Sequence, residues 1–163
     1  MTFDQSGTGL LNFTSDFVFT GFGHNKTIVL TGSTAGTGEI AGNIADPYDR
    51  QGAATTTLTK TGTGTWTLSG TNTYTGPTTV AEGTLSLATS RSLGDKTDIY
   101  VSKGATLDLN FTGEMRIRKL YLDGKLQPAG TYNTENAPNY IKGTGVLKTW
   151  PTVKLGKRNT NRR

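Results

Sequence analysis

The fold is decided by residues 58–87, which read LTKTGTGTWTLSGTNTYTGPTTVAEGTLSL. Apolar and hydroxylated residues alternate there in short runs, and glycine interrupts the runs at near-regular intervals. In the run from Thr65 to Ser69, a period of two places Trp66 and Leu68 on one face and three hydroxyl groups on the other. No window of useful length has helical spacing. The stretch therefore predicts several short β-strands with a threonine-rich outer face.

The same pattern extends along the rest of the chain. Gly, Asn, Asp or Pro separates nearly all of the further short runs, as turn chemistry requires. We expect strands at residues 10–13, 17–20, 27–31, 39–45, 57–60, 65–69, 78–81, 84–88, 99–102, 106–110, 117–123, 125–127, 130–133 and 145–149.

The composition favours a thin, elongated molecule over a thick globule. Apolar residues make up 33% of the 163 residues and charged residues 18%, both low for a globular domain, while glycine occurs 22 times. A solenoid needs less apolar content, because each coil encloses only a narrow apolar stack. Disorder is the competing interpretation, but the aliphatic and aromatic residues recur too regularly for it. The predicted fold class is all-β, a single-stranded parallel β-helix (β-solenoid).

Residues 58–87 also resemble, almost position for position, the autotransporter-associated β-strand repeat (passenger-associated transport repeat). That family builds parallel β-helix shafts of secreted, surface-exposed bacterial proteins. The resemblance implies a non-enzymatic passenger or stalk segment that aids folding and secretion, located outside the cell or at the bacterial outer envelope. It implies structural roles for Leu58, Gly62, Gly64, Trp66, Leu68, Gly70, Tyr74, Gly76, Val80, Gly83, Leu85 and Leu87.

The C-terminal part differs from the repeat. In the run from Tyr121 to Leu126, Asp123 and Gly124 are typical of a type I′ hairpin turn, which parallel coils do not contain. We therefore expect an antiparallel hairpin unit that closes the end of the solenoid and covers its unpaired edge. The runs around 105–110, 119–124 and 141–147 also resemble the terminal segment of planctomycete and verrucomicrobial repeat-rich secreted proteins.

The expected organisation has three parts. Residues 1–97 form solenoid coils, including the strong repeat at 57–90; residues 98–149 form C-terminal coils and the antiparallel cap; residues 150–163 form a basic, disordered tail. From Lys148 onward there are six basic residues and no acidic one. The other 147 residues carry eleven basic and twelve acidic residues, so the net charge of +5 belongs to the tail. A nearly neutral body argues against specific nucleic-acid binding by the fold.

The sequence lacks cysteine and shows no pattern of a transmembrane helix or a signal peptide. There is no cysteine, which excludes disulfides and thiolate metal sites. No stretch resembles a transmembrane helix, and the first residues show neither the basic start nor the apolar stretch of a signal peptide. Together with the family resemblance, this leads us to expect a fragment or processed form of a longer protein.

Few residues suggest catalysis or metal binding, and we expect neither a catalytic residue nor a cofactor. The single histidine, His24, lies between glycine-rich turns. Because some β-helices are polysaccharide lyases or hydrolases, three charged clusters are alternatives, each interpreted first as solvated charge or an amphipathic strand. They are Asp46 with Asp49 and Arg50; Asp95 with Asp98; and Glu114 with Arg116 and Arg118.

From the sequence alone, two functions of the outer surface remain open: the ordering of water and the binding of sugars. Stacked Thr-x-Thr pairs order water in ice-binding solenoids, but we expect glycines to keep these pairs out of register between coils. Seven aromatic residues could stack on sugars: Tyr74, Tyr100, Tyr121, Tyr132, Tyr140, Trp66 and Trp150. Of these, Trp66 is expected in the core, whereas Tyr74 in a turn and Tyr140 in a loop are expected to be exposed. The possible partners are thus a cell-surface glycan or another surface protein, through a carbohydrate-binding or adhesin module.

Overall fold

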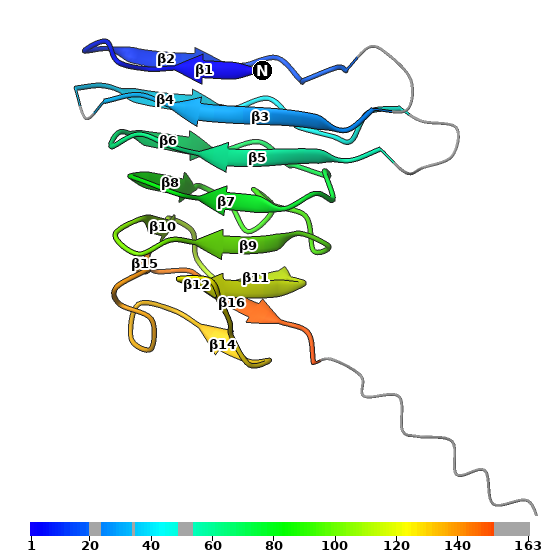
Figure 1. Cartoon of the computed structure of the whole chain (residues 1–163), viewed down its shortest axis with the longest axis vertical. Coiled ribbons are helices and arrows are strands. Elements are labelled where there is room, and N and C mark those ends of the chain that lie inside the picture. The colour runs from blue at the N-terminus through cyan, green and yellow to red at the C-terminus, as the bar shows by residue number, and fades with distance from the viewer. Residues whose placement is uncertain (20–23, 34, 49–53, 152–163) are drawn as a thin grey trace, which may run out of the picture.

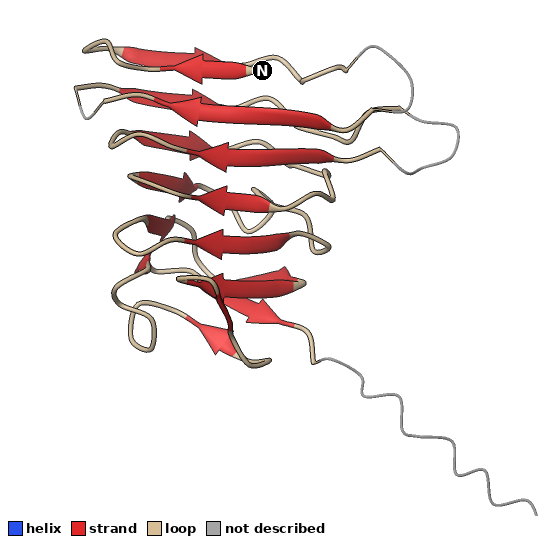
Figure 2. Ribbon diagram, in the orientation of Figure 1, coloured by secondary structure: helices blue, strands red, loops and turns tan. Residues whose placement is uncertain are grey.

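The computed structural model describes residues 1–19, 24–33, 35–48 and 54–151, which form strands joined by turns and loops (Figures 1 and 2). The strands are stacked as rungs along the long axis, with the N-terminus at one end and β14 and β16 near the other (Figure 1). No helix occurs among the described residues. The molecule is the all-β, largely parallel solenoid that the alternating sequence pattern predicts.

Two long sheets are built from alternate strands of the chain. The first sheet contains, in spatial order, β1 (Thr2–Asp4), β3 (Lys26–Thr31), β5 (Thr56–Lys60), β7 (Thr78–Val80), β9 (Asp98–Val101), β12 (Lys119–Leu122) and β13 (Lys125–Leu126). The second contains β2 (Leu10–Phe13), β4 (Thr37–Ile40), β6 (Thr65–Leu68), β8 (Thr84–Leu87), β10 (Thr106–Leu109) and β15 (Ile141–Gly143). A small third sheet contains β11 (Glu114–Ile117), β16 (Val146–Thr149) and β14 (Thr131–Tyr132).

The register of the parallel strands stacks like side chains on one another. In the second sheet, Ile40 pairs with Leu68, Leu68 with Leu87, and Leu87 with Leu109, and all four side chains are fully buried. Because successive residues of a strand face opposite sides, the intervening residues line the outer face. The core is therefore a narrow apolar column between the two sheets, built from the inward positions of each coil.

Coil length changes at the strong repeat. Val29 pairs with Thr59, 30 residues further along the chain, whereas Thr59 pairs with Thr79, 20 residues further along. Most of the difference lies in the connection between β4 and β5, residues 41–55, which is longer than the connection between β6 and β7, residues 69–77. The strands keep their register across this change, so the loops absorb the difference without disturbing the sheets.

Most expected strands form within one or two residues of their predicted ends. Only an isolated bridge, Phe17 to Ile44, forms in the expected strand 17–20, whose last residue lies outside the described residues. The expected strand 39–45 ends at Ile40, and the expected strand 117–123 is the end of β11 followed by β12. Strands β1 and β15 were not expected, because each is short and gains its pairing from a neighbouring coil rather than from its own pattern.

The antiparallel part of the C-terminal end consists of two short strand pairs. Asp123 and Gly124, with φ of 49° and 74°, connect β12 to β13 as an antiparallel hairpin. The only other antiparallel pair among the named strands of the described region is β14 with β16. Strands β9, β10 and β12 continue the parallel coils, because their alternating apolar residues pair in register with the preceding strands. Strand β11 pairs in parallel with the later strand β16.

Candidate functional surfaces

Lys60 is a charged residue in the interior that sequence reasoning did not single out. It faces inward at the end of β5, with its side chain fully buried. Its Nζ donates to the carbonyl oxygens of Thr61 at 2.7 Å, Gly62 at 2.8 Å and Glu82 at 3.1 Å. Burial lowers the pKa of Lys60 to about 8, and the charge of Glu82 opposes this shift. The ammonium group thus ties the turn of one coil to the equivalent turn of the next.

The glycines around Lys60 are required by backbone geometry. Gly62 and Gly83 have φ of 70° and 68°, in the left-handed region that side chains disfavour. A Cβ on Gly62 would also lie only 2.6 Å from the carbonyl oxygen of Gly32 in the neighbouring coil. Three further repeat glycines have backbone of the preceding coil where a Cβ would stand: Gly64, Gly70 and Gly76.

Trp66 fills the core beneath a glycine of the preceding coil. Its side chain is 1% exposed, and its Nε1 donates to the carbonyl oxygen of Thr31 at 2.8 Å. Its ring lies against Gly38, its register partner in β4, and nearly parallel to Phe13, with ring centroids 6.4 Å apart. The face that Trp66 shares with Leu68 is therefore the inner face, and Trp66 offers no surface for a ligand.

The expectation that Tyr74 is exposed is wrong. Its side chain is fully buried, and its hydroxyl shares a hydrogen bond of 2.6 Å with Thr78 Oγ1. Burial raises its pKa well above the ordinary value. The Tyr74 side chain is directed into the core by tertiary packing. The glycine-bounded sequence around Tyr74 does not reveal this burial.

Asp46 is structural rather than a freely solvated loop charge. Its carboxylate accepts hydrogen bonds from the backbone N–H of Thr56 at 2.7 Å, the backbone N–H of Thr75 at 3.1 Å and Thr75 Oγ1 at 2.7 Å. These contacts join the loop before β5 to the loop before β7. The other members of this predicted cluster, at positions 49 and 50, lie outside the described residues.

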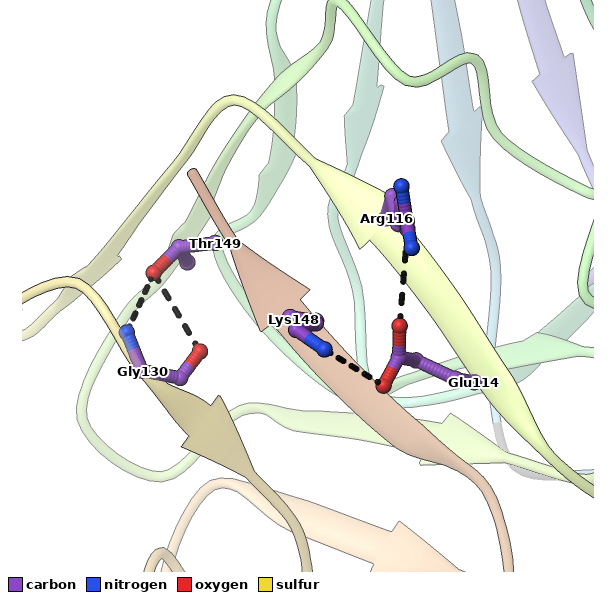
Figure 3. Close-up of polar contacts among 5 residues, drawn as sticks. All are labelled: Glu114, Arg116, Gly130, Lys148 and Thr149. Carbon is purple, nitrogen blue, oxygen red and sulfur yellow. Dashed lines mark hydrogen bonds and ion pairs between the residues drawn. The ribbon is translucent and has the colours of Figure 1, made fainter. Parts of the chain in front are cut away.

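Two further carboxylates of the predicted clusters, those of Asp98 and Glu114, form ion pairs. Asp98 accepts two hydrogen bonds from Arg118, at 2.7 and 2.8 Å, rather than pairing with Asp95 in a cation site. Glu114 lies between Arg116 and Lys148, at 3.4 and 3.3 Å, on the small sheet shown in Figure 3. Beside it, Thr149 Oγ1 bonds to the backbone of Gly130 and joins β16 to the segment before β14 (Figure 3).

No metal centre is assembled in the described part of the chain. Among those residues, no three His, Cys, Asp or Glu side chains gather closely enough to hold an ion. His24 is exposed in the loop that precedes β3. The described residues also contain no helix of the length and apolarity that a membrane span requires.

One column of single threonines stacks in register on the second sheet, whereas complete Thr-x-Thr pairs do not, as expected. Thr37, Thr65, Thr84 and Thr106 follow one another across the second sheet. Parallel templating by the neighbouring coils overrides the interruptions by glycine, which fall in the turns. The adjacent outward column is chemically mixed, with Glu39, Thr67, Ser86 and Asp108. A regular two-column Thr-x-Thr array is therefore not formed on this sheet.

The outer face of the first sheet carries a pair of stacked tyrosines. Tyr100 and Tyr121 are register partners in β9 and β12, with ring centroids 4.3 Å apart and an interplanar angle of 8°. Next to them a shallow hollow of about 420 Å³ is lined by Pro77, Thr79, Tyr100, Val101, Ser102 and Gly124. Tyr140, expected in an exposed loop, is instead half-buried against the core.

These features define a parallel β-solenoid with repeat-specific turns, and comparison with known proteins agrees. The family model described as the passenger-associated-transport-repeat matches residues 58–87, so the chain contains the repeat that its sequence resembles. The chain is also 36% identical over 107 residues to the adhesin BmaC autotransporter of Brucella suis biovar 1 (strain 1330). That match covers 64% of this chain but only 3% of the relative. No solved structure matches the chain. The resemblance to planctomycete and verrucomicrobial proteins stays a prediction.

Proposed function

We propose that this chain is a structural segment of the passenger of a secreted or cell-surface bacterial protein, in which it acts as a rigid stalk. The observation that carries the proposal is the unbroken register of inward residues through the matched repeat, from Ile40 through Leu68 and Leu87 to Leu109. A segment whose coils contact mainly their neighbours gains stability one coil at a time.

The mechanism is coil-by-coil assembly. Each completed coil presents backbone N–H and C=O groups spaced for the next strand at about 4.8 Å, together with an apolar inner surface. The Lys60 ammonium group then holds the turns of two successive coils together through the carbonyls of Gly62 and Glu82. Such a process suits a passenger that folds progressively as it emerges from an envelope.

An adhesin-like role is the second candidate. It is supported by the relative, which is named an adhesin, although the chain spans only 3% of that protein. A stalk and an adhesin module share the fold and differ in whether the outer face binds a partner. A polysaccharide-degrading enzyme is less well supported, because Asp46, Asp98 and Glu114 are engaged by the fold itself.

Surface display tests the passenger role. The chain is placed between a signal peptide and a translocating β-barrel, and its exposure is measured by protease accessibility on intact bacteria. We expect a surface-exposed, compact and protease-resistant segment. A matched Leu85→Asp variant, which buries an unpaired charge, should be degraded. A native chain that is retained inside the envelope, or is degraded as fast as the variant at the surface, would argue against the proposal.

A further inference from the structure

The outer face of the first sheet changes abruptly in character along one column of register partners. Outward residues run Val29, Thr59, Thr79, Tyr100 and Tyr121 from β3 to β12. The step from Thr79 to Tyr100 replaces a short side chain by a phenol ring. At this step, the ring of Tyr100 lies beside Thr79, whose side chain is too short to cover the face of the ring.

The stacking of the two tyrosines determines which ring face remains available. Tyr121 covers one face of Tyr100, since the rings are nearly parallel and 4.3 Å apart. The opposite face of Tyr100 is therefore directed toward β7, where its partner is Thr79. Neighbouring parallel strands lie about 4.8 Å apart, a spacing that accommodates one ring stacked on another.

The hollow at this step has the chemistry of a site for a neutral polar ring. Its volume of about 420 Å³ lies in the range of small-molecule sites. The lining combines the Tyr100 ring with Pro77 and the hydroxyl-bearing Thr79 and Ser102. Val101 and Gly124 border the hollow as well, but the Val101 side chain is buried in the core. None of the lining side chains carries a charge. Of the ionic groups nearby, Asp98 in β9 is paired with Arg118, which directly precedes β12, and Lys119 in β12 is the register partner of Asp98.

We propose that this hollow binds a pyranose ring of a neutral glycan of the glucose or N-acetylglucosamine type. Such a ring presents an apolar face of C–H groups, which are attracted to the electron-rich face of a tyrosine. Its hydroxyl groups, directed outward and sideways, reach the hydroxyls of Thr79 and Ser102 and the solvent. The site would make the stalk itself a glycan-contacting surface, and it does not depend on the proposed passenger role.

The test uses the full chain, with tri-N-acetylchitotriose and cellotriose as probes. Binding is followed by chemical-shift changes in ¹⁵N-labelled protein and by saturation transfer to the sugar. Thr79→Tyr fills the free face of Tyr100 by extending the tyrosine stack, and Tyr100→Ala removes the platform. Thr67→Ala, at an outward position of the other sheet, is the matched control. Circular dichroism establishes that each variant keeps its strand content.

We expect at least one probe to shift the signals of residues around Tyr100, and both site variants to bind roughly tenfold more weakly or not at all. The Thr67→Ala control should bind as the native chain does. If Tyr100→Ala fails to fold, Thr79→Tyr alone decides, because it keeps Tyr100 and extends the tyrosine stack at an outward position. The proposal is overturned if neither probe binds the native chain, or if Thr79→Tyr binds as tightly as the native chain.

Discussion

The indole of Trp66 occupies the space that a side chain at Gly38 would need. The two residues are register partners in β6 and β4, and a Cβ built on Gly38 would overlap ring atoms Cδ2, Cε2 and Cε3 of Trp66. Trp66 is at the same time anchored by its hydrogen bond to Thr31, so it has little freedom to withdraw. The pair couples a coil before the matched repeat to the repeat itself.

Gly38→Ala should therefore destabilise the solenoid by about 3 kcal/mol, at the upper end of the usual range for overpacking. The measurement is denaturant unfolding followed by tryptophan fluorescence and circular dichroism. Gly9→Ala is the control, because a Cβ at Gly9 would have no heavy atom within 4 Å. Equal stability of the two variants would show that Trp66 does not lie against Gly38.

Inward and outward positions of the repeat should respond differently to the introduction of a carboxylate. Leu68→Asp and Leu85→Asp each place an unpaired charge at a fully buried position, and we expect both to unfold the segment. Thr59→Asp, on the outer face between Val29 and Thr79, should stay folded. Native strand content and melting temperature in the two leucine variants would overturn the assignment of the inner face.

Removal of the Asp46 carboxylate should loosen the junction between two coils. Asp46→Ala leaves the backbone N–H groups of Thr56 and Thr75 without their acceptor, and we expect a loss of about 2 kcal/mol in the free energy of unfolding. Asp46→Asn keeps an acceptor oxygen and should recover more than half of that loss. If Asp46 is solvated and holds no part of the fold, both variants should instead be as stable as the native chain.

The lowered pKa of Lys60 predicts an unusual pH dependence of the free energy of unfolding. Its pKa is about 8 in the folded chain and 10.5 when unfolded, so between these values unfolding takes up about one proton per molecule. The unfolded chain binds more protons in this window. The free energy of unfolding should therefore rise from pH 8 to pH 10.5. Below pH 8 the cost of burying the charged lysine, which its three hydrogen bonds offset only in part, is present in full.

The control for this prediction is Lys60→Met, which keeps the length of the side chain but does not titrate. The difference in unfolding free energy between native chain and variant should change with pH across the window, because tyrosines contribute equally to both. A difference that is constant between pH 8 and pH 10 would contradict the lowered pKa of Lys60.

Strand positions and the parallel winding of the coils could be predicted well from the sequence, but the polar residues of the interior could not. The alternation of Trp66 and Leu68 with threonines is a local signal, so strand positions and inner faces could be inferred without any tertiary knowledge. The burial of Tyr74 and Lys60 could not, because it depends on how the turns of neighbouring coils approach each other. A lysine followed by a glycine-rich turn is indistinguishable in sequence from a solvated lysine.

The surfaces were harder still to predict. The stacking of Tyr100 on Tyr121 joins residues 21 positions apart, and only the coil length decides that they are register partners. The same applies to Asp98 and Arg118, which sequence reasoning had assigned to different clusters. Local patterns predict which residues face outward, whereas the length of each loop determines which outward residues meet.

The central claim is that successive coils are parallel and in register, and engineered disulfides test it most directly because the native chain has no cysteine. Thr67 and Ser86 are outward register partners, while Asp108 lies one strand beyond Ser86. Partners on neighbouring strands lie about 4.8 Å apart, which is within the range of a disulfide. Positions two strands apart are too far from each other for a disulfide. Under mild oxidation, we predict a crosslink in Thr67→Cys/Ser86→Cys and none in Thr67→Cys/Asp108→Cys. Crosslinking of the second pair instead of the first, in variants with native strand content, would contradict the solenoid.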